Sequence, residues 1–257
     1  MVLADLTAGA VEDAARRALS RPLAVVEREA AARPAALDAL SALAPADRVK
    51  IIAEVKRASP SRGALAEIPD PALQASLYEQ GGASAISVLT EERRFGGSLA
   101  DLEAVTARVS VPVLRKDFIA TPYQVFEARA AGADLVLLIV AALPQQTLQR
   151  LYTFVRELGM TPLVETHSAD EVARAVDLGS QLIGVNARNL STFELDRELF
   201  GRVADQIPAG VIRVAESAVL ELGDVQRYRD AGADAVLVGE ALVTGDPVAT
   251  LQSFLSV

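Results

Sequence analysis

Glu54 and Lys56 are the first residues of this 257-residue chain whose types and spacing could do acid–base chemistry. They lie in the stretch I-I-A-E-V-K-R-A-S-P-S-R-G, residues 51–63, and in a β-strand two residues two positions apart point to the same face. Two charges on a core-facing side are costly to bury unless they pair with each other or with a substrate. A structural salt bridge is the simpler interpretation of an isolated E-x-K, and an acid–base site is the alternative.

The loop after Lys56 favours the site interpretation. Its sequence Ser59-Pro60-Ser61-Arg62-Gly63 supplies two hydroxyl groups, a proline with a fixed φ and a permissive glycine. A stiff, polar loop beyond a lysine at a strand end is typical of an anion site. We therefore expect an anionic small molecule to bind here.

Polar residues also end other apolar runs of the chain. Any one of them is equally well explained by a strand that turns into a loop, but seven such ends together favour a common site. These ends carry Glu54 and Lys56, Thr90, Lys116 and Asp117, Glu165, Asn186 and Arg188, Glu216 and Ser217, and Gly239 and Glu240.

The elements that must position these residues follow an alternating pattern. From Lys50 onward, short apolar runs alternate with amphipathic helical stretches, which is typical of a parallel sheet. Four segments repeat a glycine that closes a helix in the left-handed conformation, followed by a buried strand. They are G-G-A-S-A-I-S-V-L-T from Gly81, A-G-A-D-L-V-L-L-I-V from Ala131, L-G-S-Q-L-I-G-V-N-A from Leu178 and A-G-A-D-A-V-L-V-G-E from Ala231.

Four more apolar runs, at 49–56, 111–116, 161–165 and 211–216, bring the predicted strands to eight. Eight βα units in about 210 residues favour an α/β fold of the (β/α)8 TIM-barrel type over an open, doubly wound sheet. We expect residues 1–257 to form a single barrel domain, with the alanine-rich residues 1–47 as a helical N-terminal extension. The carboxyl ends of barrel strands converge, so the polar ends would share one pocket.

Composition excludes several classes of function. The chain has no cysteine and one histidine, so a disulfide framework, a zinc centre and a Ser-His-Asp triad are not expected. A net charge of −9 argues against a nucleic-acid partner. The N-terminus lacks the pattern of a signal peptide and no apolar run is long enough to span a bilayer, so we expect a cytoplasmic protein with no membrane contact.

The chain from about residue 50 onward resembles the indole-3-glycerol-phosphate synthase family. The resemblance rests on motifs that occur in order and at suitable spacing, while residues 1–47 match only in helical character. The motifs are A-E-V-K-R-A-S-P-S-R-G from Ala53, S-V-L-T-E-E-R-R-F-G-G-S from Ser87, P-V-L-R-K-D-F-I from Pro112, G-A-D-L-V-L-L-I-V from Gly132, L-V-E-T-H from Leu163, I-G-V-N-A-R-N-L from Ile183 and V-A-E-S from Val214. In that family the N-terminal extension covers the top of the barrel.

The resemblance implies an enzyme of tryptophan biosynthesis, a carboxy-lyase. Its substrate, 1-(2-carboxyphenylamino)-1-deoxyribulose 5-phosphate, is an anionic sugar phosphate that carries an anthranilate group. The substrate closes onto its aromatic ring, loses carbon dioxide and then water, and gives indole-3-glycerol phosphate. These steps need only proton transfer and electrostatics, so we expect no cofactor and no metal, and we expect a monomer.

The resemblance also implies roles for the polar strand ends. Lys116 matches the catalytic lysine and would protonate the oxygen formed in ring closure, although a structural pair with Asp117 is the alternative. Glu165 fits the base of the dehydration and Lys56 a second acid or an anion anchor, and which lysine acts in which step stays open. Glu54 would hold Lys56 in its charged form. Glu216 would orient the substrate or a lysine, and Asn186 completes the predicted catalytic set.

Binding residues are implied in the same way. Arg188, with Asn186, would contact the substrate carboxylate and hydroxyls. Phe95 and Phe118 match positions that line the anthranilate pocket, although a phenylalanine is more often plain core. We expect the phosphate at backbone N–H groups of the loops after the last two barrel strands, with Ser59 nearby. Those groups belong to Ser217, Ala218, Gly239 and Glu240.

His167 and Ala218 are two positions that the resemblance does not fully account for. His167, the only histidine, follows Glu165 closely, but the resemblance assigns it no role and we expect a loop position. Where the family commonly reads E-S-G, this chain reads Glu216-Ser217-Ala218. We expect a negative φ at Ala218, so that alanine fits without strain and its N–H still reaches the phosphate, whereas a positive φ would strain the loop.

Two rival classes of function share parts of this pattern. A Schiff-base aldolase also places a lysine at a barrel strand end, and a non-catalytic sugar-phosphate-binding barrel would keep the phosphate loops. Trapping with borohydride identifies the first. Turnover to an indole product, which is fluorescent, excludes the second.

Overall fold

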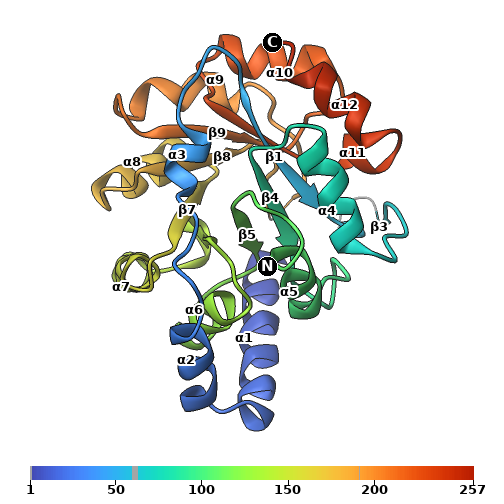
Figure 1. The fold of residues 1–257 in the computed structure, drawn as a ribbon. Helices are drawn as coiled ribbons and strands as arrows, with labels where there is room; N and C mark the ends of the chain where they lie inside the picture. Colours follow the sequence, from blue (N-terminus) through green and yellow to red (C-terminus); the bar gives the residue numbers. More distant parts are fainter. Residues whose placement is uncertain (1, 60–62, 191) are drawn as a thin grey trace.

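Eight parallel strands form a closed barrel in this computed structural model, which describes residues 2–59, 63–190 and 192–257 (Figure 1). Around the barrel the order is β1-β10-β9-β8-β7-β6-β5-β4, so strands adjacent in the chain pair with each other and β1 closes the ring. The strands are β1 (Lys50–Val55), β4 (Ala85–Leu89), β5 (Val113–Lys116), β6 (Leu135–Ile139), β7 (Thr161–Thr166), β8 (Leu182–Asn186), β9 (Ile212–Glu216) and β10 (Ala235–Val238). The predicted (β/α)8 barrel is confirmed.

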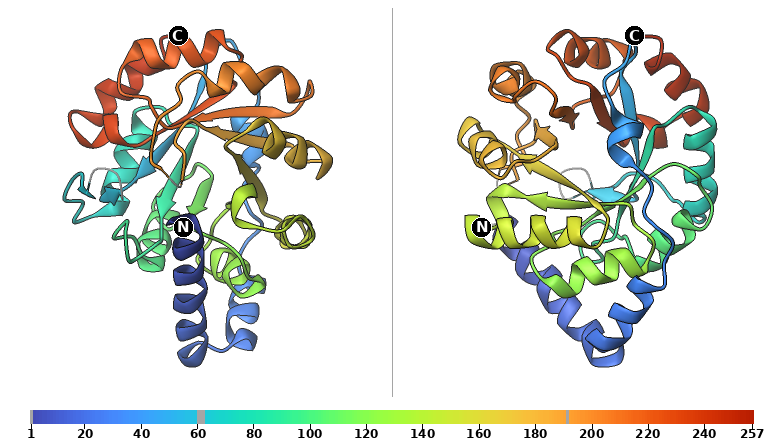
Figure 2. Two further views of the ribbon diagram at one scale, coloured as in Figure 1. Left: turned by 180° about the vertical axis from the view of Figure 1, so that it is seen from behind. Right: turned by 60° about the vertical axis from the view of Figure 1, so that its left-hand side comes forward.

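Helices pack around the outside of this barrel (Figures 1 and 2). They are α4 (Pro71–Gln80), α5 (Leu99–Thr106), α6 (Pro122–Ala130), α7 (Gln145–Glu157), α8 (Ala169–Asp177), α9 (Leu199–Val203), α10 (Leu222–Asp230), α11 (Glu240–Val243) and α12 (Pro247–Phe254), with short 3₁₀ turns η1 (Val140–Ala142) and η2 (Ala204–Gln206). Many begin at a side chain that accepts a hydrogen bond from an amide of the first turn. These N-caps are Asp70, Ser98, Thr121, Ser168 and Asp246.

The repeated glycines end helices as predicted. Gly82, Gly132, Gly179 and Gly232 all have positive φ, between 73° and 100°, and each is followed within a few residues by a barrel strand. Only glycine adopts this conformation without a steric cost, so it reverses the chain directly into the next strand.

The aspartate that follows two of these glycines explains why the G-A-D sequence repeats. Asp134 accepts hydrogen bonds from the backbone N–H of Val113, at 2.8 Å, and of Leu37, at 2.7 Å. Asp234 accepts one from the N–H of Arg213, also at 2.8 Å. In both cases the aspartate binds the first residues of the neighbouring strand, at the amino-terminal end of the barrel. The repeat therefore fixes strand register at the end opposite the polar strand ends.

Side-chain alternation separates two layers of core. Ile52, Leu114, Leu163 and Leu237 point inward and pack inside the barrel, and their strand neighbours pack outward under the helices. Two residues further along each strand, the inward position becomes polar or glycine. Those positions are Glu54, Lys116, Glu165 and Gly239, and on β8 and β9 they are Asn186 and Glu216.

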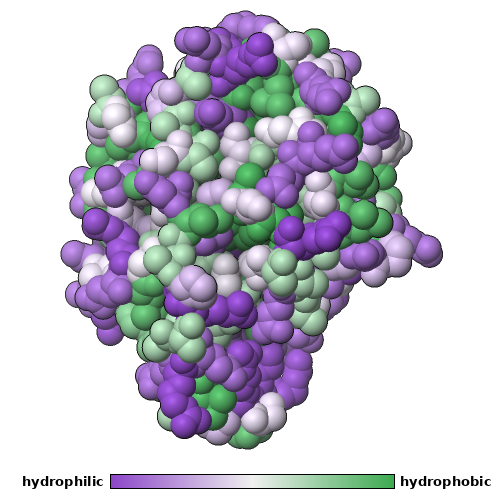
Figure 3. Space-filling view, in the orientation of Figure 1, coloured by the Kyte–Doolittle hydropathy of each residue, from purple (hydrophilic) through white to green (hydrophobic). Residues whose placement is uncertain are grey.

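Three helices precede the barrel: α1 (Val2–Ser20), α2 (Leu23–Ala31) and α3 (Ala39–Leu43). The first two lie side by side and project from the barrel in all views (Figures 1 and 2), and hydrophilic residues predominate over the face of this pair seen in Figure 3. Arg17 ties α1 to α6 through a hydrogen bond of 2.6 Å to Glu127.

The extension reaches both ends of the barrel, with α1 at the carboxyl end and α3 at the amino-terminal end. Leu6 of α1 lies at the carboxyl-end pocket. Leu40 and Leu43 of α3 instead pack at the amino-terminal end, where Leu40 shares a small cavity with Thr161 and Pro162 at the start of β7. Only α1 is therefore placed to influence the pocket.

The two aspartates of the repeat give a matched test of stability. Removing Asp134 leaves two backbone N–H groups without their acceptor, of which that of Val113 is buried, and removing Asp234 leaves one that is partly buried. An unsatisfied N–H group costs about 1–3 kcal/mol when it is buried and less when water can reach it. We expect Asp134→Ala to lower the free energy of unfolding in urea more than Asp234→Ala does. Neither change should alter turnover, because both side chains lie at the end of the barrel away from the pocket. Equal losses in the two variants would contradict this account.

Candidate active site

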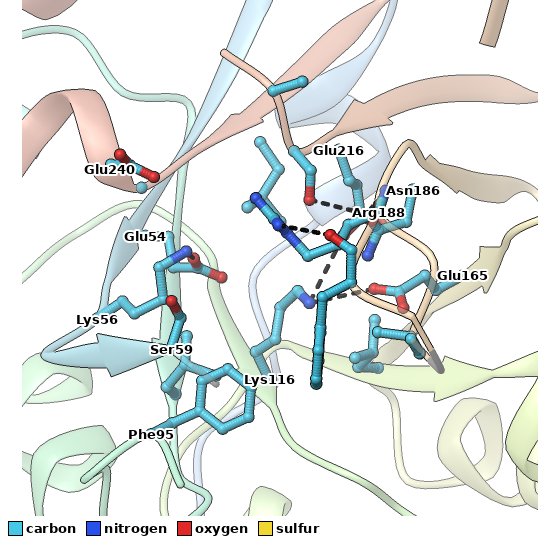
Figure 4. Close-up of a pocket in the computed structure, with 18 of the residues that line it drawn as sticks. Glu54, Lys56, Ser59, Phe95, Lys116, Glu165, Asn186, Arg188, Glu216 and Glu240 are labelled. Atoms are coloured by element: carbon cyan, nitrogen blue, oxygen red, sulfur yellow. Dashed lines mark hydrogen bonds and ion pairs between the residues drawn. The ribbon is translucent and has the colours of Figure 1, made fainter. Parts of the chain in front are cut away.

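One pocket lies at the carboxyl ends of the barrel strands, and all of the predicted site residues line it (Figure 4). The predicted residues in its wall are Glu54, Lys56, Ser59, Phe95, Lys116, Phe118, Glu165, Asn186, Arg188, Glu216, Ser217, Ala218, Gly239 and Glu240. The predicted anion loop also included Pro60, Ser61 and Arg62, which lie outside the described residues. Strand ends far apart in sequence are thus brought into one cavity, as parallel barrel geometry requires.

Lys116 is the central cation of the pocket. Its Nζ lies 3.1 Å from Oε2 of Glu165 and 3.6 Å from Oε2 of Glu216. Burial lowers the pKa of the Lys116 ammonium, but Glu165, Glu216 and Glu54 outweigh burial and hold that pKa above its ordinary value. The lysine is therefore a charged proton donor in the resting pocket.

The alternative pairing of Lys116 with Asp117 is wrong. Consecutive strand residues point to opposite faces, and the Asp117 carboxylate accepts hydrogen bonds from Thr90 Oγ1 at 2.6 Å and from Arg115 Nη2 at 3.0 Å. Arg115 is fully buried on the outer side of the barrel and also contacts Glu127 at 3.4 Å. This network holds the two residues beside Lys116 on the outer face, so that Lys116 points inward.

Glu165 and Glu216 are two buried carboxyl groups with opposite protonation tendencies. Burial raises the pKa of the Glu165 carboxyl, but the nearby Lys116 ammonium and His167 lower it well below its usual range. Burial and the neighbouring Glu165 carboxylate raise the pKa of Glu216 well above its usual range, against the opposing effect of Lys116. Neither Glu216 oxygen has a hydrogen-bond partner among the described residues. Such a divergent pair is typical of a site that holds and moves a proton.

Glu54 and Lys56 form a second pair on the opposite side of the pocket. Lys56 Nζ donates a hydrogen bond to Glu54 Oε2 at 2.5 Å, as the shared strand face predicted. A Cβ on Gly239 would lie 2.7 Å from the same glutamate oxygen and 2.9 Å from the lysine Nζ. Glycine at this strand end therefore leaves the space that the pair occupies.

Asn186, Ser217 and Arg188 are joined at the next edge of the pocket. Asn186 Oδ1 accepts hydrogen bonds from Ser217 Oγ at 2.8 Å and from the Arg188 backbone N–H at 3.0 Å. The Arg188 guanidinium donates to the Phe193 carbonyl at 3.1 Å. The two hydrogen bonds to Oδ1 thus fix the orientation of the Asn186 side chain.

The backbone at Ala218 differs from the expectation. Ser217 has φ of 69° and Ala218 has φ of 59°, so the expected negative φ at Ala218 is wrong. Tyr228 Oη donates to the Ser217 carbonyl at 3.2 Å, and Asp224 accepts from the Leu220 N–H at 2.9 Å. These contacts from α10 hold the loop in a left-handed turn that costs an alanine about 1 kcal/mol.

Apolar residues form the remaining wall. The rings of Phe95 and Phe118 lie 6.2 Å apart between centroids, tilted by 43°. Leu137 and Ile139 of β6 contribute further apolar surface, and Leu6 from α1 closes the side. A flat aromatic group fits such a wall beside the charged cluster.

Sequence reasoning did not single out several residues of the pocket wall, among them Leu137, Ile139 and Arg197. Two further contributors that it missed are His167 and Leu6. His167 does lie in the loop after β7, as expected, but its Nε2 is 3.2 Å from Glu165 Oε1. The only feature of the sequence that could have indicated this contact is that His167 lies two residues after Glu165. Leu6 gave no signal, because nothing in its local sequence shows that α1 reaches the pocket.

Metal and membrane sites are not indicated in the described parts of the chain. Within residues 2–59, 63–190 and 192–257, no group of three His, Asp or Glu side chains is arranged to hold a metal ion. Over the same residues, no helix is long and apolar enough to cross a membrane.

A (β/α)8 barrel that gathers two lysines and four glutamates at its strand carboxyl ends defines a barrel enzyme able to give and take protons. The family model described as indole-3-glycerol phosphate synthase matches residues 3–253. The chain belongs to this indole-3-glycerol phosphate synthase family.

Individual relatives agree with the family match. The indole-3-glycerol phosphate synthase of Leifsonia xyli subsp. xyli is 73% identical over 256 residues, covering 100% of this chain and 98% of the relative. That of Beutenbergia cavernae is 60% identical, covering 96% and 92%. Among solved structures, the N-acetylmannosamine-6-phosphate 2-epimerase from Clostridium perfringens superposes with a TM-score of 0.62 at 14% identity, over 82% of this chain and 93% of that one. The latter likeness supports the barrel fold alone.

Gly184 gives a test of how tightly Glu216 is placed. A Cβ at residue 184 would lie 2.1 Å from Glu216 Oε1, so Gly184→Ala must displace that carboxyl. We expect kcat to fall at least about tenfold with the fold intact, since a small displacement of a carboxyl group that orients Lys116 or the substrate is costly. The matched control is Gly201→Ala, where the new Cβ would meet its neighbour at 3.7 Å. Wild-type turnover in Gly184→Ala would show that the position of Glu216 does not matter.

The positive φ at Ala218 gives a second test. Ala218→Gly removes the steric cost of the left-handed conformation and should stabilise the protein by up to about 1 kcal/mol. Ala32→Gly, at φ of −80°, should instead destabilise it. Because the loop already has this conformation, we expect KM to change less than about tenfold, or ~1.4 kcal/mol. A larger improvement in KM would mean that alanine distorts the native loop after β9.

Proposed function

We propose that this chain converts 1-(2-carboxyphenylamino)-1-deoxyribulose 5-phosphate into indole-3-glycerol phosphate, carbon dioxide and water. The observation that carries the proposal is the Lys116 ammonium, held 3.1 Å from the Glu165 carboxylate at the base of the pocket. Together they place a proton donor and a proton acceptor within reach of one substrate. Family membership supplies the substrate's identity.

Ring closure is the step assigned to Lys116. The aromatic carbon that bears the carboxylate attacks the ketone carbon, and negative charge builds on the ketone oxygen. A buried ammonium stabilises that charge strongly and then transfers its proton to the oxygen. Loss of carbon dioxide restores the aromatic ring without further proton transfer.

Dehydration is the step assigned to Glu165 and Lys56. Glu165 is ionised, because the nearby Lys116 ammonium and His167 lower its pKa, and it accepts the proton that leaves the methylene carbon between the nitrogen and the former ketone carbon. Lys56 protonates the departing hydroxyl group, and Glu54, at 2.5 Å, holds it in position. The two cations thus lie on different sides of the pocket, which suits two proton deliveries to one substrate.

Substrate binding follows from the remaining walls. Arg188 suits the carboxylate by its two-pronged geometry, and Phe95 and Phe118 flank the aromatic ring. The phosphate is assigned to the loops after β9 and β10, at backbone N–H groups of Ser217, Ala218, Gly239 and Glu240, with Ser59 nearby. A single barrel domain over residues 1–257, a monomeric state, a cytoplasmic location and a reaction without cofactor stay predictions.

The electrostatics of Lys116 argue against the aldolase alternative. A Schiff base forms from a neutral amine, so such enzymes lower the pKa of the reactive lysine. Here carboxylates surround the lysine and raise its pKa. The non-catalytic alternative does not explain why a second lysine–glutamate pair lies opposite the first.

Turnover with the authentic substrate tests the proposal. We expect the native chain to form a fluorescent indole product, Lys116→Ala to lower kcat at least ~10²-fold and Glu165→Gln to lower it strongly. Lys50→Ala is the matched control, because Lys50 begins β1 at the opposite end of the barrel. Near-normal turnover by folded Lys116→Ala would refute its role, and borohydride labelling of Lys116 with a ketose phosphate would favour an aldolase.

A further inference from the structure

Glu91 is a buried glutamate in the motif T-E-E-R-R-F-G-G-S, and the proposed reaction gives it no step. It lies just after β4 and outside the described wall of the pocket. Its carboxylate accepts three hydrogen bonds from the backbone of the loop that follows. Oε1 accepts from the N–H of Arg93 at 3.1 Å, and Oε2 accepts from those of Arg94 at 2.7 Å and Phe95 at 3.0 Å. Glu91 therefore fixes the backbone that carries the Phe95 ring.

The loop around Glu91 closes tightly on the end of β4. The Gly97 N–H donates to the Glu91 carbonyl at 2.9 Å, and a Cβ on Gly97 would lie only 2.0 Å from the Leu89 carbonyl oxygen. Residues 91–97 thus form a closed turn with the carboxylate bonded to its backbone. Phe95 is the residue of this turn that lines the pocket (Figure 4).

Phe118, the second ring of the aromatic wall, is fixed in the same way. Its backbone N–H donates to Asp117 Oδ1 at 2.8 Å. The other Asp117 oxygen, Oδ2, accepts from Thr90 Oγ1 at 2.6 Å, and Thr90 directly precedes Glu91. These three side chains, Thr90, Glu91 and Asp117, are all buried, and we call them the polar frame. The polar frame joins the backbones of the two phenylalanines, whose ring centroids lie 6.2 Å apart.

A polar frame gives an aromatic wall what apolar packing alone does not. Hydrophobic contacts are non-directional, whereas hydrogen bonds have narrow ranges of length and angle. A gap of only about 0.5–1 Å between two surfaces already loses a quarter to a half of their dispersion attraction. A wall that must match a flat group therefore needs its rings held in fixed positions.

We propose that Glu91 and Thr90 are positioning residues that hold the Phe95 and Phe118 rings against the aromatic ring of the substrate, an inference that rests on the proposed function. Proton transfer takes place on the charged side of the pocket, so the wall contacts the substrate alike before and during the reaction. An interaction of that kind contributes to KM and not to kcat. The polar frame therefore determines affinity for the aromatic group.

Glu91→Ala tests the contact between the frame and Phe95. We expect KM to rise at least about fivefold and kcat to stay within about threefold of wild type, because the lost interaction is uniform binding. Glu91→Gln should recover most of the affinity, since its amide oxygen can still accept the N–H groups of Arg94 and Phe95. The substrate reduced at its ketone, which can no longer close its ring, measures the same affinity without turnover.

Thr90→Val tests the contact between the frame and Asp117. It keeps the shape of the side chain and removes the hydroxyl, so KM should rise in the same sense, and Thr90→Ser should restore it. Thr106→Val is the matched control, because the Thr106 hydroxyl donates to the Ala131 carbonyl at 2.7 Å, between the ends of α5 and α6 and away from the pocket. Its KM should equal that of wild type. Thermal denaturation checks folding, and Thr90→Val carries the test if Glu91→Ala does not fold.

A double-mutant cycle with Phe95→Leu separates positioning from a general structural role. Where the ring is already absent, Glu91→Ala should raise KM by less than about twofold, because no ring is left to position. A larger effect in that background would overturn the inference, since Glu91 would then act independently of Phe95.

Two further results would overturn the role of the frame alone. A rise in KM below about fivefold in folded Glu91→Ala would show that the wall does not need the frame, and a fall in kcat beyond about threefold would show that Glu91 serves the reacting groups. Failure of the native chain to form the indole product would instead overturn the proposed function. In that case, loss of binding of the reduced substrate by the native chain would overturn the inference as well.

Discussion

A buried ammonium at the mouth of an apolar barrel is stable only when carboxylates surround it, and this constraint on Lys116 organises the site. Glu165 and Glu216 lie 3.1 and 3.6 Å from its Nζ. Their mutual repulsion then favours one ionised and one protonated carboxyl group. The Lys116 ammonium therefore keeps Glu165 ionised, whereas burial and the Glu165 carboxylate favour the protonated form of Glu216.

The pleat of the parallel strands determines which charges reach the pocket. Lys116 points inward, and its neighbours Arg115 and Asp117 point outward, where they pair with each other and with Glu127. Residues 115–117 thus place Lys116 in the pocket, and on the outer face they place Arg115 and Asp117, which hold β5 to the surrounding residues by ion pairs. The outer pairs also link to α1, since Arg17 binds Glu127. One network of ion pairs therefore joins α1, which lies at one side of the pocket, to β5, which carries Lys116.

Glycine keeps the inner face open where carboxyl groups need room. Gly184 lies against Glu216 and Gly239 against the Glu54–Lys56 pair, at distances that would not admit a Cβ. Ala218 shows the reverse situation, in which a loop keeps a left-handed turn although its residue has a side chain. Contacts from Tyr228 and Asp224 hold that loop, so tertiary structure overrides the local preference of alanine.

The sequence alone determined the barrel and most of the charged residues in its pocket. Helices that end in glycine and alternate with apolar strands are compatible with few folds. Residues at strand ends, such as Glu54 and Asn186, had to lie in one pocket because the carboxyl ends of parallel barrel strands converge. Only the tertiary structure decided that Lys116 pairs with Glu165 and Glu216 and not with its neighbour Asp117, that Ala218 has a positive φ, and that His167 and Leu6 belong to the site. The reason is physical. The local sequence sets the hydrophobic periodicity of each element and the face on which each side chain lies. Contacts between strands, and between α1 and the barrel, depend instead on how distant segments pack.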